Sequence, residues 1–179
     1  MDERFFRALQ FASEKHKHHR RKGGRDVPYI NHPIAVATQL ATVGGVTDPA
    51  VLAAAILHDT VEDTDATPDE LNTLFGADIA GLVAEVTDDP LLTSAQRKLT
   101  QEHEAARKSP RAKLIRLSDK TCNVHDIACN PPPDWSTERR MEYFNWAERV
   151  VANLRGIHVE LEAAFDAAVA EARSVTAGR

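Results

Sequence analysis

Apolar residues recur at helical spacing along most of the chain, as Phe5, Leu9 and Ala12 do near its N-terminus. No segment shows the alternation that is typical of a half-buried strand, and no repeat or domain linker stands out. We therefore expect an all-α fold. The expectation is a single helical bundle over residues 1–179, with its core at about 2–172 and a frayed C-terminal tail.

Capping and stop residues divide this pattern into helices. Residues typical of helix starts are Asp48 with Pro49, Thr67 with Glu70, Thr93 with Gln96, Ser109 with Pro110, and Ser136. Gly23-Gly24 and Gly44-Gly45 indicate helix ends, and the Pro-rich segment 130–134 indicates a loop. The expected helices are 4–17, 32–43, 49–63, 68–76, 77–87, one that begins after Thr93, 110–129, and a long region after Ser136 that is interrupted near Gly156.

Composition narrows the class of protein. The 179 residues suffice for one domain, and the net charge of −5 argues against a nucleic-acid binder. No stretch has the length of a membrane span, and the N-terminus lacks the apolar core of a signal peptide. Cys122 and Cys129 lie seven residues apart on one expected helix, about 10 Å from each other. That spacing is too long for a disulfide, so we expect a reduced, cytoplasmic protein in which both thiols are packing residues.

His58 begins the densest group of candidate functional side chains. On a continuous helix Glu62, Asp59 and Asp63 fall at about 40°, 100° and 140° from His58. The preceding run 50–57 is almost wholly apolar, which indicates a buried helix. Buried charges are costly without partners. We therefore interpret this cluster as a divalent-metal site rather than as a solvated acidic face beside a core histidine.

A single His-Asp pair leaves a metal short of ligands, so further ligands are expected. His32 begins a helix just before Pro33, and Asp119 lies off the apolar stripe of the helix 110–129. Taken alone, His32 fits a helix-terminal histidine equally well, and Asp119 fits a solvated acid. Two imidazoles and two carboxylates suit Mn²⁺, Fe²⁺ or Zn²⁺, and this donor set does not choose among them.

A basic cluster stands out in this acidic chain. Its members are Lys15, Lys17, Arg20, Arg21, Lys22 and Arg25. A helix C-terminus accounts for one or two such cations through its dipole. Guanidinium forks match phosphate oxygens, so a phosphate-rich ligand is the better interpretation of the rest. We expect Lys15 and Lys17 to be solvated.

The order His32, His58-Asp59, Asp119 resembles the spaced pattern of the HD hydrolase superfamily. Over nearly its whole length the chain also resembles the hydrolase domain of RelA/SpoT proteins, and most of all the stand-alone small alarmone hydrolases called metazoan SpoT homologues. The segments that carry this likeness are Arg21-Lys22, Pro28 to Pro33 (PYINHP), His58 to Asp63 (HDTVED), Glu85 to Asp89 (EVTDD), Leu117 to Asn123 (LSDKTCN) and Trp135 to Trp146.

The resemblance implies a single HD domain that hydrolyses guanosine 3′,5′-bis(diphosphate) and its pentaphosphate form. Pyrophosphate would leave from the 3′ position, which gives GDP or GTP. The implied cofactor is one Mn²⁺ per chain, held by His32, His58, Asp59 and Asp119. The implied catalytic pair is Glu62 and Asp63, and the implied substrate contacts are Arg21, Lys22, Asn123, Arg139 and Tyr143.

Two positions depart from the family pattern. His125 stands where the family commonly has an arginine, and the loop at Thr93-Ser94 lacks a lysine that some relatives place there. Arg97 and Lys98 follow that loop closely. Both departures concern phosphate contacts and leave the metal site unaffected.

Two alternative functions belong beside this one. The first is an HD phosphohydrolase that acts on another nucleotide, either the 2′-phosphate of NADPH or a deoxynucleotide. Arg21-Lys22 and residues 29–31 favour the alarmone over a general nucleotidase, but NADPH stays open. The second is a non-catalytic nucleotide sensor, which the retained Glu62-Asp63 pair disfavours. Alarmone synthesis is not expected, because the chain ends where a synthetase domain would begin.

Overall fold

The computed structural model describes residues 2–23 and 26–178, and within these residues the regular structure is helical. The only strand-like pairing among them is an isolated antiparallel bridge between Arg20 and Pro28. The helices are α1 (Glu3–Lys15), α2 (Asn31–Thr42), α3 (Pro49–Leu57), α4 (Thr60–Asp63), α5 (Pro68–Phe75), α6 (Ala77–Val86), α7 (Ser94–Glu104), the short 3₁₀ helix η1 (Ala105–Arg107), α8 (Pro110–Cys129), α9 (Thr137–Ala152) and α10 (Val159–Ala177). The expected all-α class is confirmed.

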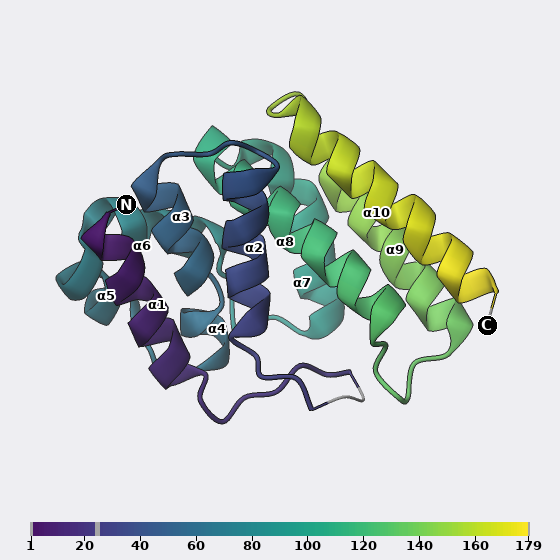
Figure 1. Ribbon diagram of the computed structural model, residues 1–179, viewed down its shortest axis with the longest axis horizontal. Helices are drawn as coiled ribbons and strands as arrows, with labels where there is room; N and C mark the ends of the chain where they lie inside the picture. The colour runs from purple at the N-terminus through teal and green to yellow at the C-terminus, as the bar shows by residue number, and fades with distance from the viewer. Residues whose placement is uncertain (1, 24–25, 179) are drawn as a thin grey trace.

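Helix α8 runs through the middle of the molecule and most other helices pack around it (Figure 1). Helices α2 and α3 lie on one side of α8, with α1, α5 and α6 beyond them, and α9 and α10 cover the other side. The apolar helix α3 is buried almost throughout, as its sequence predicted. Its last turn therefore delivers the polar residues that follow it to the centre of the fold.

Helix starts agree closely with the capping residues of the sequence. The side chains of Asp48, Thr67, Ser109 and Ser136 each accept a hydrogen bond from a backbone N–H in the first turn. Thr93 and Gln96 form a complete capping box. Each cap satisfies a donor that has no partner inside the helix, which is why short local patterns locate these boundaries well.

The helix expected over 49–63 is wrong in one respect, because it breaks at His58-Asp59. Thr60 Oγ1 donates to the carbonyl oxygen of Leu57 at 2.7 Å, and His58 Nδ1 lies 2.8 Å from the carbonyl oxygen of Ala55. These side chains use carbonyls that would otherwise accept from the next turn. Asp59 consequently has φ −98° and ψ −3°, and a separate short helix, α4, begins after it.

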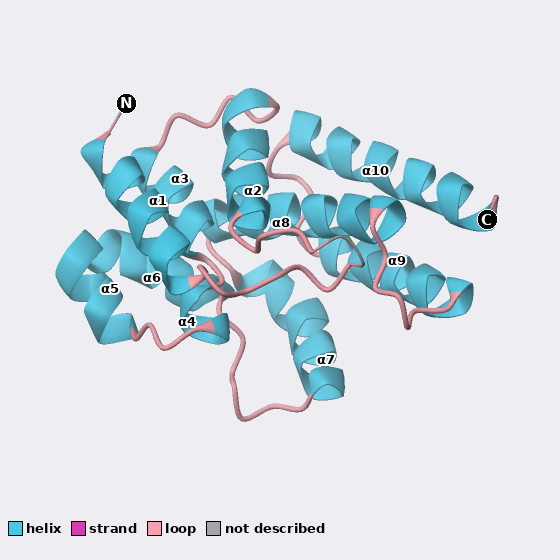
Figure 2. Ribbon diagram, turned by 60° about the horizontal axis from the view of Figure 1, so that its bottom comes forward, coloured by secondary structure: helices cyan, strands magenta, loops and turns pink. Residues whose placement is uncertain are grey.

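Two other expected boundaries differ from the structure. Helix α1 ends at Lys15, close to the expected end at residue 17, and the described residues between α1 and α2, including Gly23, form a loop. In Figure 2 this loop runs across the N-terminal end of α2 toward α8. Helix α10 continues to Ala177, beyond the expected limit of the core at about 172, and Thr176 is buried. The expected interruption near Gly156 is confirmed, and Gly156 has φ 87°.

The cysteine interpretation is correct for one residue and wrong for the other. Both thiols are free, and Cys122 is partly buried against the core. Cys129 is exposed and does not pack in the core. No helix of the described chain is both long enough and apolar enough to span a membrane.

Candidate metal centre and substrate pocket

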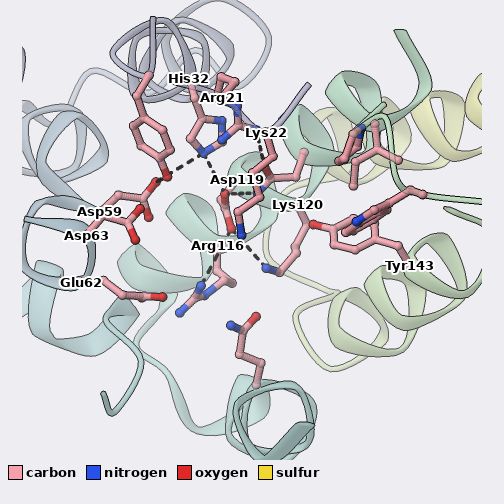
Figure 3. A pocket seen from close by; sticks show the side chains of 16 residues that line it. Arg21, Lys22, His32, Asp59, Glu62, Asp63, Arg116, Asp119, Lys120 and Tyr143 are labelled. Atoms are coloured by element: carbon pink, nitrogen blue, oxygen red, sulfur yellow. Dashed lines mark hydrogen bonds and ion pairs between the residues drawn. The ribbon is translucent and has the colours of Figure 1, made fainter. Parts of the chain in front are cut away.

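Three separate elements bring the four expected metal ligands together. His32 lies in the first turn of α2, His58 and Asp59 occupy the break between α3 and α4, and Asp119 lies midway along α8. His32 Nε2 is 3.6 Å from Asp59 Oδ2 and 3.2 Å from Asp119 Oδ1. His58 Nε2 is 3.1 Å and 3.7 Å from the same two oxygens. Figure 3 shows His32, Asp59 and Asp119 converging on one point.

The orientation of His58 fits a metal ligand. Its Nδ1 must carry the hydrogen, because the carbonyl oxygen of Ala55 beside it can only accept. The lone pair of a neutral ring then lies on Nε2, which is buried and has no hydrogen-bond partner in the described chain. A lone pair aimed at two carboxylates is unfavourable unless a proton or a cation lies between them. Burial alone lowers the pKa of His58, but Asp59 and Asp119 outweigh it and raise the pKa to about 10.

The donor set therefore fits a divalent cation. His32, His58 and Asp59 each offer one ligand atom within 4.8 Å of the others, and they are the one such cluster of metal-ligating side chains in the described residues. Asp119 completes the group through the oxygen that faces both imidazoles. Burial opposes ionisation of Asp119, yet Lys120 and the two histidines lower its pKa well below the usual range. Two imidazoles with two carboxylates are ordinary ligands for Mn²⁺, Fe²⁺ or Zn²⁺.

The candidate catalytic pair lies on α4, one turn after the metal-ligand candidates. Glu62 and Asp63 are exposed to a cavity of about 290 Å³, which the four metal-ligand candidates except His58 also line. The walls of the cavity partly shield the carboxyl of Glu62 from water, and this desolvation raises its pKa. The negative charge of Asp88 raises the pKa of Glu62 further. Burial also raises the pKa of Asp63, with Asp59 as the second cause. Raised pKa values bring both carboxyls closer to the range that suits proton transfer near neutral pH.

Arg21 and Asn123 are joined by a hydrogen bond between their side chains. Arg21 donates to Asn123 Oδ1 at 2.7 Å and to Asp126 Oδ2 at 3.0 Å. Asn123 in turn donates to Asp119 Oδ1 at 2.6 Å. This chain of bonds fastens the loop after α1 to α8. Both residues line the cavity, and so does Lys22, which makes no ion pair within the described residues.

The other described members of the basic cluster, Lys15, Lys17 and Arg20, do not line the cavity. Lys15 was expected to be solvated, but it forms ion pairs instead. Its ammonium lies 3.0 Å from Asp65 and 3.2 Å from Glu70. Lys17 is exposed and pairs with Glu14, and Arg20 pairs with Asp26. Arg25 lies outside the described residues. The described members of the cluster thus divide into the ion-paired Lys15, Lys17 and Arg20 and the two cavity residues Arg21 and Lys22.

Arg139 and Tyr143 lie on α9 at a second cavity of about 650 Å³. This cavity also contains Arg97 and Lys98, and it shares Lys22, Glu62, Gln101, Trp135 and Tyr143 with the first cavity. The Arg139 guanidinium stacks on Trp135 at 4.6 Å from the ring centre. His125, in contrast, is exposed near Cys129 and lines neither cavity. The departure at His125 therefore falls outside the pocket.

Sequence reasoning missed three residues of the site, of which Arg116 and Lys120 are buried and Tyr29 is half-buried. Tyr29 donates to Asp59 Oδ2 at 2.7 Å, and its ring stacks on buried His16 at 4.7 Å. Arg116 and Lys120 lie within 4 Å of Asp119 Oδ2. The signal for Arg116 and Lys120 was their spacing on α8, three residues before and one residue after Asp119. Tyr29 gave a weaker signal, because only the tertiary fold brings it to Asp59.

Comparisons with known proteins identify the family of the chain. The HD domain family matches residues 8–145. The chain is 49% identical over 163 residues to guanosine-3′,5′-bis(diphosphate) 3′-pyrophosphohydrolase MESH1 of Drosophila melanogaster, covering 91% of each chain. It is 49% identical over 158 residues to the protein of the same name from Homo sapiens, covering 88% of each.

A solved structure described as a metazoan ortholog of SpoT that hydrolyses ppGpp superposes with a TM-score of 0.91. It is 48% identical, and the match covers 94% of both chains. Sequence and fold thus agree over nearly the whole length of these relatives. The chain belongs to the HD domain family and, within it, to the guanosine-3′,5′-bis(diphosphate) 3′-pyrophosphohydrolases.

Proposed function

We propose that this protein hydrolyses guanosine 3′,5′-bis(diphosphate) and its pentaphosphate form, and releases pyrophosphate from the 3′ position to give GDP or GTP. One observation carries the proposal. His32, Asp59 and Asp119 line one cavity with the Glu62-Asp63 pair, and the wall of that cavity also holds cations. The relatives named for this reaction support the substrate, since they match nearly the whole chain.

We propose that His32, His58, Asp59 and Asp119 hold one Mn²⁺ per chain. A divalent ion so held supplies a Lewis acid that polarises a phosphoryl oxygen and makes water a better nucleophile. The buried lone pair of His58 and the converging carboxylates support this assignment. The chain would act as one HD domain, and its two free thiols favour a reducing, cytoplasmic location.

The acidic pair handles protons in this mechanism. The oxygen of water bonds to the phosphorus next to the ribose 3′-oxygen, and the bond from that phosphorus to the 3′-oxygen breaks. One proton of the water passes to the Glu62-Asp63 pair, and the pair returns a proton to the departing 3′-oxygen, which leaves as the 3′-hydroxyl. Lys22 and Arg21 offset the charge of the diphosphates. Tyr143 and Arg139 border the second cavity, where the rest of the nucleotide has room.

A product analysis tests the proposal. Purified protein with Mn²⁺ is incubated with the two alarmones, NADPH and deoxynucleotides, and the products are separated by chromatography. The expected products are GDP or GTP with intact pyrophosphate, and label from isotopic water appears in pyrophosphate only. Orthophosphate as first product, or activity confined to NADPH or deoxynucleotides, would refute it.

The metal assignment is tested separately. Asp59→Asn and Asp119→Asn should lose both bound Mn²⁺ and turnover, because each removes a charged ligand. Glu171→Gln, at an exposed position of α10, is the matched control and should keep both. Full activity in excess chelator, or Mn²⁺ retained by both aspartate variants, would contradict the assignment.

A further inference from the structure

Lys120 is a buried cation beside the metal-ligand candidates. It is only 3% exposed, and its Nζ lies 3.3 Å from Asp119 Oδ2. The same ammonium sits 4.6 Å above the ring of Trp146. Trp146 is itself fixed, since its Nε1 donates to the carbonyl oxygen of Lys98 at 3.2 Å. Helices α7 and α9 thus hold Lys120 in one place at the wall of the cavity.

The carboxylate of Asp119 divides its two oxygens between different partners. Oδ1 faces the imidazoles of His32 and His58, whereas Oδ2 faces Lys120 and Arg116. In Figure 3 Lys120 and Asp59 lie on opposite sides of Asp119. A cation that occupies the centre therefore leaves Lys120 within reach of any group bound next to it.

The ammonium of Lys120 has N–H donors without a partner in the part of the protein that the structure describes. An ammonium has three N–H donors, and Asp119 is the only hydrogen-bond acceptor of Nζ within the described residues. Arg116 donates to the carbonyl oxygen of Val86 and lies 3.5 Å from Asp88. Asp119 also shares its single charge with Arg116 and the metal centre. A buried ammonium so weakly neutralised is costly unless an anionic ligand completes its shell.

We propose that Lys120 contacts the diphosphate that is hydrolysed, with its ammonium donating to a non-bridging oxygen on the attacked phosphorus. This inference rests on the proposed function and adds a catalytic residue to it. Lys120 transfers no proton and forms no covalent bond. It stabilises the negative charge that gathers on that phosphoryl group, so its loss lowers kcat as well as phosphate affinity.

The test compares Lys120→Gln with Lys113→Gln, which makes the same change on the same helix away from the cavity. Bound Mn²⁺, the melting temperature, kcat and KM are measured, and inorganic pyrophosphate binding to the metal-loaded protein is titrated by calorimetry. Lys120→Gln should keep its Mn²⁺, lose about 100-fold in kcat, and bind pyrophosphate about tenfold more weakly. Lys120→Arg should recover part of both losses, and Lys113→Gln should match the wild type.

Two results would overturn the inference. Wild-type kcat and pyrophosphate affinity in Lys120→Gln would make Lys120 a structural residue. Loss of Mn²⁺ together with activity would mean that it acts only through Asp119. If Lys120→Gln does not fold, Lys120→Met, which keeps a side chain of similar length without the charge, enters the same assays. Failure of the wild type to hydrolyse the alarmone would refute the proposed function, while pyrophosphate titration would still test Lys120.

Discussion

The hydroxyl of Tyr29 donates a hydrogen bond to Asp59 Oδ2 at 2.7 Å, and this is the same oxygen that faces both His32 and His58. Tyr29 thus orients a metal-ligand candidate from outside the ligand set. Its own position is fixed by stacking on His16, whose pKa burial lowers to about 4, so that His16 is neutral at pH 7. The loop after α1 therefore supports the metal centre as well as the substrate pocket.

Tyr29→Phe should weaken Mn²⁺ binding by about 10–100-fold, the usual effect of removing a partner of a metal ligand. The ring and its stacking on His16 stay, so the melting temperature of the metal-free protein should change little. Titration of Mn²⁺ into the metal-free variant measures the effect. Unchanged affinity would show that Asp59 keeps its orientation without Tyr29.

Metal binding should release protons and strengthen as pH rises. In the metal-free protein the pKa of His58 is raised from 6.5 to about 10, so His58 is protonated at pH 8 and must lose that proton to bind a metal. Calorimetry in buffers of different ionisation enthalpy counts the released proton. A metal affinity independent of pH between 6 and 9 would contradict the assignment.

A raised pKa also means that His58 stabilises the metal-free fold below pH 6.5 and loses that contribution as pH rises through 10.

Glu62→Gln and Asp63→Asn should keep Mn²⁺ and the fold, and should lose about 100-fold or more in kcat. Each change removes a proton acceptor and nearly preserves the size of the side chain. Single-turnover kinetics and substrate binding separate the lost chemical step from binding. A variant with a near wild-type rate would remove that residue from the proposed pair.

Lys22→Ala should raise KM, and added salt should raise it less in the variant than in the wild type, because an unpaired cavity cation is lost. Lys17→Ala is the matched control, since Lys17 is exposed and pairs with Glu14. Arg21→Ala should raise KM too, but it also releases Asn123 and Asp126, so its effect includes movement of the loop. Equal, small effects at Lys17 and Lys22 would contradict a role of Lys22 in substrate binding and favour the alternative that the basic cluster is solvated.

The sequence predicted the helical class and most helix starts because these depend on local chemistry. A capping side chain such as Ser109 or Thr93 bonds to a backbone N–H only three residues away. The break at His58-Asp59 escaped prediction because it depends on side chains competing for the carbonyls of the preceding turn. No propensity scale for residues 49–63 contains that competition.

The candidate site shows the same division between local and distant causes. The spacing of His58, Asp59, Glu62 and Asp63 was visible because one segment holds them. Tyr29 was not visible as a partner of Asp59, which lies 30 residues away. Lys15 was misjudged for the same reason, since its partner Asp65 lies 50 residues further along the chain. Burial and ion pairing are properties of the folded chain, and sequence spacing does not encode them directly.

The break between α3 and α4 also separates two structural roles within one segment. In one continuous helix every residue is rotated by about 100° from the last, so the direction of Glu62 would follow from the packing of Leu57 and Ala53. With the break, α3 is buried almost throughout, while α4 exposes Glu62 and Asp63 to the cavity. A substitution in α3 is therefore expected to act on the core, and a substitution of either acid in α4 on the cavity.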